Sequence, residues 1–64
     1  MEKTMVVETV YREEDRTLLY RDARYHVIAP RNVEVKPGDT IQYEPFGVNF
    51  GFFIENLGVQ KANG

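Results

Sequence analysis

Four phenylalanines are the side chains of this sequence best suited to binding. Phe46, Phe50, Phe52 and Phe53 lie close together, in a stretch that also contains Gly47. Exposed aromatic rings on a small domain mark a partner surface, because they bind apolar side chains or stack on nucleic-acid bases. Strand alternation would turn Phe50 and Phe52 toward the core, so we expect Phe46 and Phe53 to be the side chains left for binding.

A catalytic or metal centre is not indicated by the remaining residues. His26 is the only histidine and the chain has no cysteine. No nucleophile, phosphate-binding loop or set of metal ligands stands at a recognisable spacing. We therefore expect no enzyme activity, no cofactor and no bound metal, and we interpret His26 as a solvent-facing strand residue.

Charged residues are mixed rather than segregated, and the net charge is −2 with a pI of about 5.2. The acidic run Glu13-Glu14-Asp15 has too few oxygen ligands for a calcium loop, so we interpret it as a charged hairpin tip. Five arginines fall in the N-terminal half and are interleaved with acidic residues, which favours a solvated mixed-charge surface over an anion site: Arg12, Arg16, Arg21, Arg24 and Arg31. The missing basic surplus counts against nucleic acid as the main partner.

Compartment and domain number follow from length and hydropathy. Sixty-four residues allow one domain. No signal-peptide pattern and no apolar run of membrane-spanning length is present. The sequence predicts a soluble cytoplasmic protein with no membrane partner, and its thin core and lack of disulfides favour homo-oligomer formation.

Alternating, β-branched runs dominate the chain, and they predict strands rather than helices. Within the first run, Met5, Val7, Thr9 and Tyr11 form the uncharged face and are expected in the core. Ile41 and Tyr43 are expected inward in a later run. The predicted strands cover residues 4–12, 17–21, 25–29, 33–35 as a short extra strand, 40–44 and 50–55.

Turn residues separate these runs. Lys36-Pro37-Gly38-Asp39 predicts a type II turn, because proline presets the first central angle and glycine accepts the positive φ of the second. Asp22 suits the turn before Tyr25. Residues 57–64 are expected to form a frayed tail.

Five to six short strands without a helix predict an all-β domain, either a small antiparallel barrel or a rolled sheet. The missing helix favours an SH3-like barrel over an OB-like one. An open five-stranded sheet that completes its core by dimerising is the third alternative.

Two local stretches resemble known families. Asn49 to Glu55, NFGFFIE, is similar to the base-stacking aromatic strand of cold-shock and S1-type OB domains, and the turn at 36–39 is similar to the start of many S1 domains. The same turn, followed by an alternating strand, looks like the swapped-hairpin DNA-binding domains of the AbrB type. The aromatic strand comes last here, lysines are absent between Lys36 and Lys61, and the AbrB-type helix is missing. We interpret both similarities as shared turn chemistry, not family membership.

The sequence thus favours a non-enzymatic module that binds a protein, or itself, through an exposed aromatic edge. The alternative is single-stranded nucleic-acid binding through Tyr43, Phe50, Phe52 and Phe53.

Overall fold

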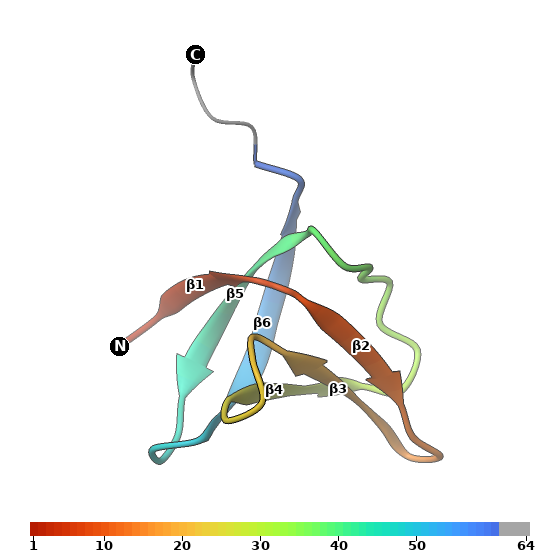
Figure 1. Cartoon of the computed structure of the whole chain (residues 1–64), viewed down its shortest axis with the longest axis horizontal. Coiled ribbons are helices and arrows are strands. Elements are labelled where there is room, and N and C mark those ends of the chain that lie inside the picture. Colours follow the sequence, from red (N-terminus) through yellow and green to blue (C-terminus); the bar gives the residue numbers. More distant parts are fainter. Residues whose placement is uncertain (61–64) are drawn as a thin grey trace.

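Short runs of alternating residues form six strands in the computed structural model, which describes residues 1–60 (Figure 1). This part of the chain contains no helix, so the prediction of a small all-β barrel or rolled sheet is confirmed. The strands are β1 (Lys3–Val6), β2 (Thr9–Arg12), β3 (Arg16–Tyr20), β4 (His26–Pro30), β5 (Thr40–Pro45) and β6 (Phe50–Gly58).

All six strands belong to one sheet, in the order β1-β5-β6-β4-β3-β2. β2, β3 and β4 form an antiparallel meander, and β5 and β6 form a hairpin. The two parts join through β4 and β6, the only parallel pair among the described strands. The segment from 31 to 39 connects β4 to β5, and these two strands are not neighbours in the sheet because β6 lies between them.

The sheet must curl, because its two edge strands are neighbours in the sequence. A flat sheet would place β1 and β2 five strand spacings apart, about 24 Å at about 4.8 Å each. Val6 and Thr9 are three Cα steps apart, which is about 11 Å at most. β1 and β2 therefore run as one bent strand that arches above β3 and β4 in Figure 1, and the upper ends of β5 and β6 extend past this arch.

Val7 and Glu8 form the bend and carry the chain from one partner to the next. The Val7 N–H donates to the Asp39 carbonyl oxygen at 2.8 Å, and the Val7 carbonyl accepts from the Gly38 N–H at 2.8 Å. One residue later, the Glu8 N–H donates to the Tyr20 carbonyl at 2.8 Å. Val7 is only 1% exposed, so the bend closes over the core.

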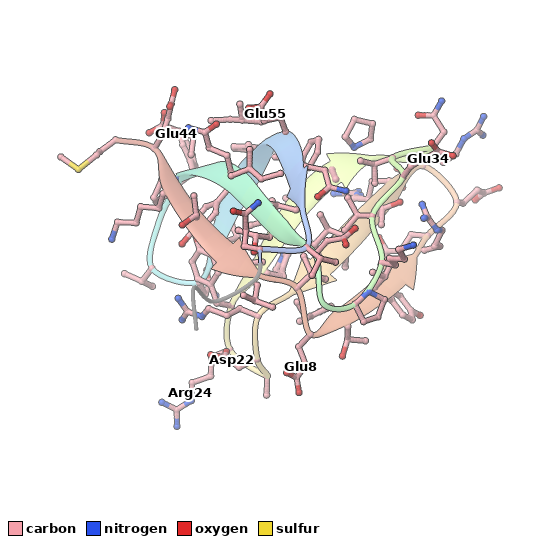
Figure 2. The ribbon with its side chains drawn as sticks, turned by 90° about the horizontal axis from the view of Figure 1, so that it is seen from above. Glu8, Asp22, Arg24, Glu34, Glu44 and Glu55 are labelled. Carbon is pink, nitrogen blue, oxygen red and sulfur yellow. The ribbon has the colours of Figure 1, made fainter. Side chains whose placement is uncertain are left out.

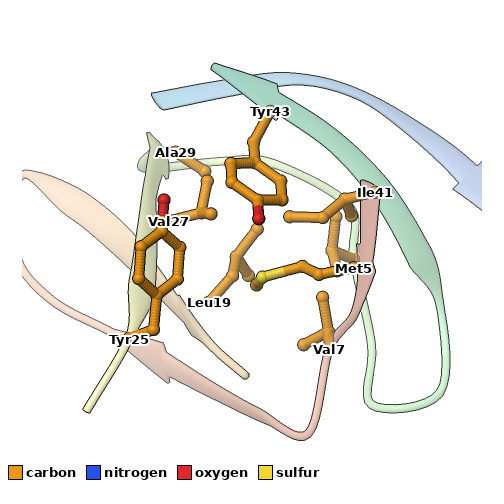
Figure 3. Close-up of a cluster of buried hydrophobic side chains, with 9 residues drawn as sticks. Met5, Val7, Leu19, Tyr25, Val27, Ala29, Ile41 and Tyr43 are labelled. Atoms are coloured by element: carbon orange, nitrogen blue, oxygen red, sulfur yellow. The ribbon is translucent and has the colours of Figure 1, made fainter. Parts of the chain in front are cut away.

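The core fills the inside of this curl (Figure 3). Leu19, Val27 and Ile41 are fully buried, and Tyr43 is nearly so. The predicted inward positions of Met5, Val7, Ile41 and Tyr43 are confirmed. The buried hydrophobic residues are Met5, Val7, Leu19, Tyr25, Val27, Ala29, Val35, Ile41 and Tyr43.

The first predicted strand, 4–12, is wrong as a single alternating element. The bend at Val7 and Glu8 shifts the alternation by one residue, so Val10 packs against the core instead of Thr9 or Tyr11. Thr9 is exposed and Tyr11 is 57% exposed. Tyr11 lies opposite Leu18 of β3, on the outer surface of the sheet.

The segment before β5 also differs from its prediction. Residues 33–35 do not form a strand, although Val35 is buried and Val33 packs against the core. The predicted turn after them is confirmed: Gly38 has a φ of 98°, and the Asp39 N–H donates to the Lys36 carbonyl at 3.1 Å. The Asp22 turn is confirmed as well, since its Oδ1 accepts from the Arg24 and Tyr25 N–H groups at 2.8 and 3.0 Å.

The last strand is longer than predicted and irregular. β6 continues past Glu55 to Gly58, so residues 57 and 58 of the predicted tail belong to the sheet. Its register against β5 shifts twice, which leaves Ile54 and Leu57 without partners in β5. These irregularities are β-bulges, which increase the local twist that a curled sheet needs. Residues 61–64 of the predicted tail lie outside the described residues.

Gly51 occupies a position of β6 that no side chain could fill. A Cβ on this residue would lie 2.7 Å from the Glu44 carbonyl oxygen, 2.8 Å from the Tyr25 hydroxyl and 3.0 Å from the Tyr43 ring. Tyr25 and Tyr43 pack with their ring centroids 5.6 Å apart beneath it. Glycine at this point therefore lets the backbone of β6 approach the two tyrosines.

We predict that Gly51→Ala destabilises the fold by about 1–3 kcal/mol, because the methyl group must displace backbone or a buried ring. Urea unfolding followed by circular dichroism measures the loss. Val48→Ala is the matched control, since Val48 is 97% exposed and should change stability by less than about 0.5 kcal/mol. Equal stability of Gly51→Ala and the wild type would contradict the close approach described above.

Candidate functional site

The outer surface of β3, β4 and β6 is unusually apolar for a solvent-facing sheet. Leu19, Val27 and Gly51 are among the inward residues of these strands, so their neighbours in the sequence face out. Leu18 of β3 lies opposite Ile28 of β4, and Ile28 lies opposite Phe52 of β6. With Tyr11 opposite Leu18, four apolar side chains form one row across the strands.

A second, aromatic row lies beside the first. Tyr20, His26 and Phe50 occupy matching positions on β3, β4 and β6. The rings of Tyr20 and His26 are 5.3 Å apart, and those of His26 and Phe50 are stacked at 6.4 Å between centroids. The predicted outward position of His26 is confirmed. Its ring is half-buried because two aromatic neighbours flank it.

Phe46 joins the two rows from the loop between β5 and β6. Its N–H donates to the Phe50 carbonyl at 2.9 Å, and Gly47 completes the turn with a φ of 93°. The Phe46 ring lies 5.7 Å from that of Phe50 and 5.4 Å from that of Phe52, and Phe50 and Phe52 are 5.8 Å apart. We call the resulting chain of rings the aromatic strip: Tyr20, His26, Phe50, Phe46 and Phe52.

The predicted orientation of β6 is wrong. Phe50 and Phe52 are predicted to face inward, but both lie on the outer surface, and Phe52 is 43% exposed. Phe53, the expected outward residue, is half-buried and packs against the core. The reason is Gly51, because only a residue without a side chain fits against Tyr25 and Tyr43 on the inside.

Of the five candidate binding residues, the structure brings three together on the outside. Phe46, at 60% exposure, is grouped with Phe50 and Phe52. Tyr43 is 3% exposed and belongs to the core, and Phe53 lies on the inner side.

Tyr20 and His26 were not recognised as parts of a site. The available signal was that each stands next to a core residue, Leu19 and Val27, and so faces out. Joining them to Phe50 requires the parallel pairing of β4 with β6, which no local pattern in the sequence contains.

Carboxylates border the apolar surface on the β5 side. Glu44 faces out from β5 directly opposite Phe52, and Glu55 lies opposite Gln42. The Gln42 side chain donates to Glu2 Oε1 at 2.7 Å, which brings a third carboxylate to this margin. The Met1 amino group lies 2.6 Å from Glu44 Oε2. Figure 2 shows Glu44 and Glu55 along one side of the molecule.

Two of the five arginines pair with acidic side chains close to them in the sequence. Arg16 lies 3.6 Å from Glu13 and 3.3 Å from Asp15. Arg21 lies 3.2 Å from Asp22 and its guanidinium stands 4.7 Å from the Tyr25 ring centroid.

One end of the curled sheet has an open hollow of about 650 Å³, lined by residues of both charge signs such as Arg12, Lys36 and Glu34. At its floor, Asp39 Oδ2 accepts from the Asn56 side chain at 3.0 Å and from the Lys36 N–H at 3.1 Å. These two hydrogen bonds, that of Asn56 first, lower the pKa of Asp39 below its ordinary 3.8. The arrangement ties β6 to the turn before β5, and we interpret it as structural.

A metal centre is not formed by the part of the chain that the structure covers, since no three histidine or carboxylate side chains there are grouped to hold an ion. Within residues 1–60 there is also no helix that could cross a lipid bilayer.

Comparison of the chain with protein-family models, with curated proteins and with solved structures finds no match. The outer surface must therefore be interpreted from its own geometry and charge.

We predict that Asp39→Asn lowers stability at neutral pH and that this loss shrinks in acid. A carboxylate whose folded pKa is depressed adds stability above its unfolded pKa, here 3.8, and loses that contribution as the pH falls toward the folded value. Urea unfolding of both proteins, at about pH 7 and about pH 3, measures the difference.

Asp22 also has a lowered pKa, first because of the Arg24 N–H, but it is present in both proteins and cancels in this comparison. A stability difference that stays constant from neutral to acid pH would show that the Asp39 charge does not contribute.

Proposed function

We propose that this chain is a non-enzymatic interaction module that binds protein through the aromatic strip and the apolar row beside it. A second copy of the chain is a less favourable partner than a different protein, because the carboxylates that border this surface would meet their own counterparts. The single observation that carries this proposal is the contact of Phe46 and Phe52 with each other while 60% and 43% of their surfaces remain exposed.

Burial favours a protein partner for this surface. Stabilising the fold does not require Phe46 or Phe52 to stand outside, because the core is complete on the other side of the sheet. Large apolar side chains grouped in water cost free energy, and a partner that covers them recovers about 25 cal/mol for each Å² of apolar surface. Aromatic residues are also the side chains most enriched at protein interfaces.

Charge argues in the same direction. Nucleic acid requires lysines or arginines beside the stacked bases. Along β3, β4 and β6 the only outward-facing basic group that always carries a charge is Arg16, and it contacts Glu13 and Asp15. Glu44 instead stands next to Phe52. A phosphate backbone along the strip would meet carboxylates.

Connectivity nevertheless supports nucleic acid as a second candidate. If β1 and β2 are counted together as one bent first strand, β3 to β6 become the second to fifth strands. The spatial order around the sheet is then 1-2-3-5-4-1, and the third and fifth strands are parallel. We propose that this arrangement is OB-like rather than SH3-like, with the helix replaced by the segment from 31 to 39. OB barrels bind oligonucleotides on the face of strands 2 and 3 and on the neighbouring loops, and Tyr20, His26 and Phe46 occupy those positions here.

We predict that Phe52→Ser weakens peptide binding at least about tenfold while leaving the fold intact, because an aromatic anchor at the centre of an interface carries much of its binding energy. The measurement is selection of a displayed random-peptide library on the wild-type protein, followed by titration of the enriched peptides against each variant. Val48→Ser is the control, because Val48 is exposed in the same loop as Phe46 and forms no part of the strip.

The competing candidate is tested with a single-stranded oligonucleotide of mixed sequence at low salt, with tyrosine fluorescence as the signal. Tight, salt-sensitive quenching that Phe52→Ser abolishes would overturn the proposal in favour of nucleic acid. Enriched peptides that bind Phe52→Ser as well as the wild type would remove the aromatic strip from the proposal.

A further inference from the structure

We infer that the occupant of the outer surface is an extended apolar segment of a partner protein that carries lysine or arginine on the flank that meets the Phe52 end of the row. This inference rests on the proposed function and names the partner class for the same surface. It follows from the charges at the two ends of the apolar row and from the length of that row.

The first end of the row is acidic. Phe52 is its terminal apolar residue on β6, and its neighbour on β5 is Glu44. Glu55 lies three residues further along β6, opposite Gln42, and the Gln42 side chain donates to Glu2 Oε1 at 2.7 Å. Three carboxylates thus meet one positive group, the Met1 amino group on Glu44.

The second end carries side chains of both charge signs. The row ends at Tyr11 on β2, and the hairpin that follows carries Glu13, Glu14 and Asp15. Arg16 contacts two of these three carboxylates, at 3.6 and 3.3 Å, so it is neutralised by them. Arg12 stands at the start of the same hairpin, and its guanidinium donates to the Arg31 carbonyl at 3.3 Å. Positive groups therefore lie beside the carboxylates at this end, and the Phe52 end is the acidic end of the row.

Basic residues elsewhere do not offset the acidic margin at the Phe52 end. Arg24 lies on the opposite side of the molecule from Glu44 and Glu55 in Figure 2. Arg21 is held by Asp22 and by the Tyr25 ring. Lys3 pairs with Tyr43, an inward position of β5, and so does not face the outer surface. A second copy would bring the same acidic margins to the interface, and like charges repel.

The length of the row suits an extended segment. From Phe52 through Ile28 and Leu18 to Tyr11 the row crosses three strand spacings, about 14 Å at about 4.8 Å each. Alternate side chains of an extended chain lie about 7 Å apart, so three of them cover the row. Residues just beyond these three reach Glu44 and Glu55 on one flank and the hairpin tip on the other.

Three synthetic peptides test the inference. All contain the core Leu-Ser-Phe-Ser-Leu, and they differ only in paired lysine, serine or glutamate residues on both flanks. We expect the lysine peptide to bind the full chain about tenfold more tightly than the glutamate peptide at low salt, because several partly exposed ion pairs each contribute a fraction of that factor. Added salt should reduce the ratio toward one.

Matched variants locate the charge effect. Glu55→Gln should lower the preference for lysine over glutamate flanks, whereas Glu8→Gln should retain it, because Glu8 lies on the opposite side of the molecule from Glu55 in Figure 2. Both variants change the net charge equally. An equal reduction by the two would overturn the inference, since it would assign the preference to overall charge.

Failure of this inference differs from failure of the proposed function. Equal binding of the lysine and glutamate peptides, lost in Phe52→Ser, would overturn the basic-flank inference and leave the outer surface as a protein-binding site. Binding of none of the three peptides, or binding that Phe52→Ser does not change, would overturn both.

Discussion

The bend at Val7 and Glu8 is the constraint on which the rest of the structure depends. It joins the two edge strands of one sheet and is fixed by three hydrogen bonds: the Val7 N–H donates to the Asp39 carbonyl, the Gly38 N–H donates to the Val7 carbonyl, and the Glu8 N–H donates to the Tyr20 carbonyl. Because so short a connection cannot span a flat six-stranded sheet, the sheet has to curl, and curling creates an inside and an outside. Leu19, Ile41 and Val27 fill the inside. The outer surface of β3, β4 and β6 then has no layer packed on it within the described chain.

Gly51 determines which way the aromatic residues of β6 face. With the rings of Tyr25 and Tyr43 packed against each other inside the curl, β6 can approach only where it carries no side chain. Alternation then sends Phe50 and Phe52 outward. The fold itself does not require an aromatic residue at position 52, because a polar residue could face the solvent there at little cost in stability. The exposed rings are therefore better explained by a partner than by the fold.

Buried polar groups show where the same packing leaves little freedom. The Tyr25 hydroxyl is buried without a hydrogen-bond partner among the residues described, and burial first, then the neighbouring Tyr43, raises its pKa. Asp39, by contrast, is satisfied by Asn56 and Lys36. The unpaired Tyr25 hydroxyl costs free energy, which the packing of the two tyrosine rings beneath Gly51 offsets. The Asp39 carboxylate links β6 to the turn that meets the bend. Both lie inside, which leaves the outer surface free of structural hydrogen bonds between its side chains and the core.

Local patterns in the sequence were enough for the class of fold, for most strands, for the turns at Asp22 and Pro37-Gly38, and for the inward side chains of Met5, Val7, Ile41 and Tyr43. These features depend on residues a few positions apart, through alternation and turn chemistry. The phase shift at Val7 and Glu8, the outward direction of Phe52 and the parallel pairing of β4 with β6 depend on contacts between distant segments. Tyr20, His26 and Phe46 become one strip only when that pairing exists. The candidate residues could be named from the sequence, but which of them face a partner was decided by the close approach of β6 to two tyrosines.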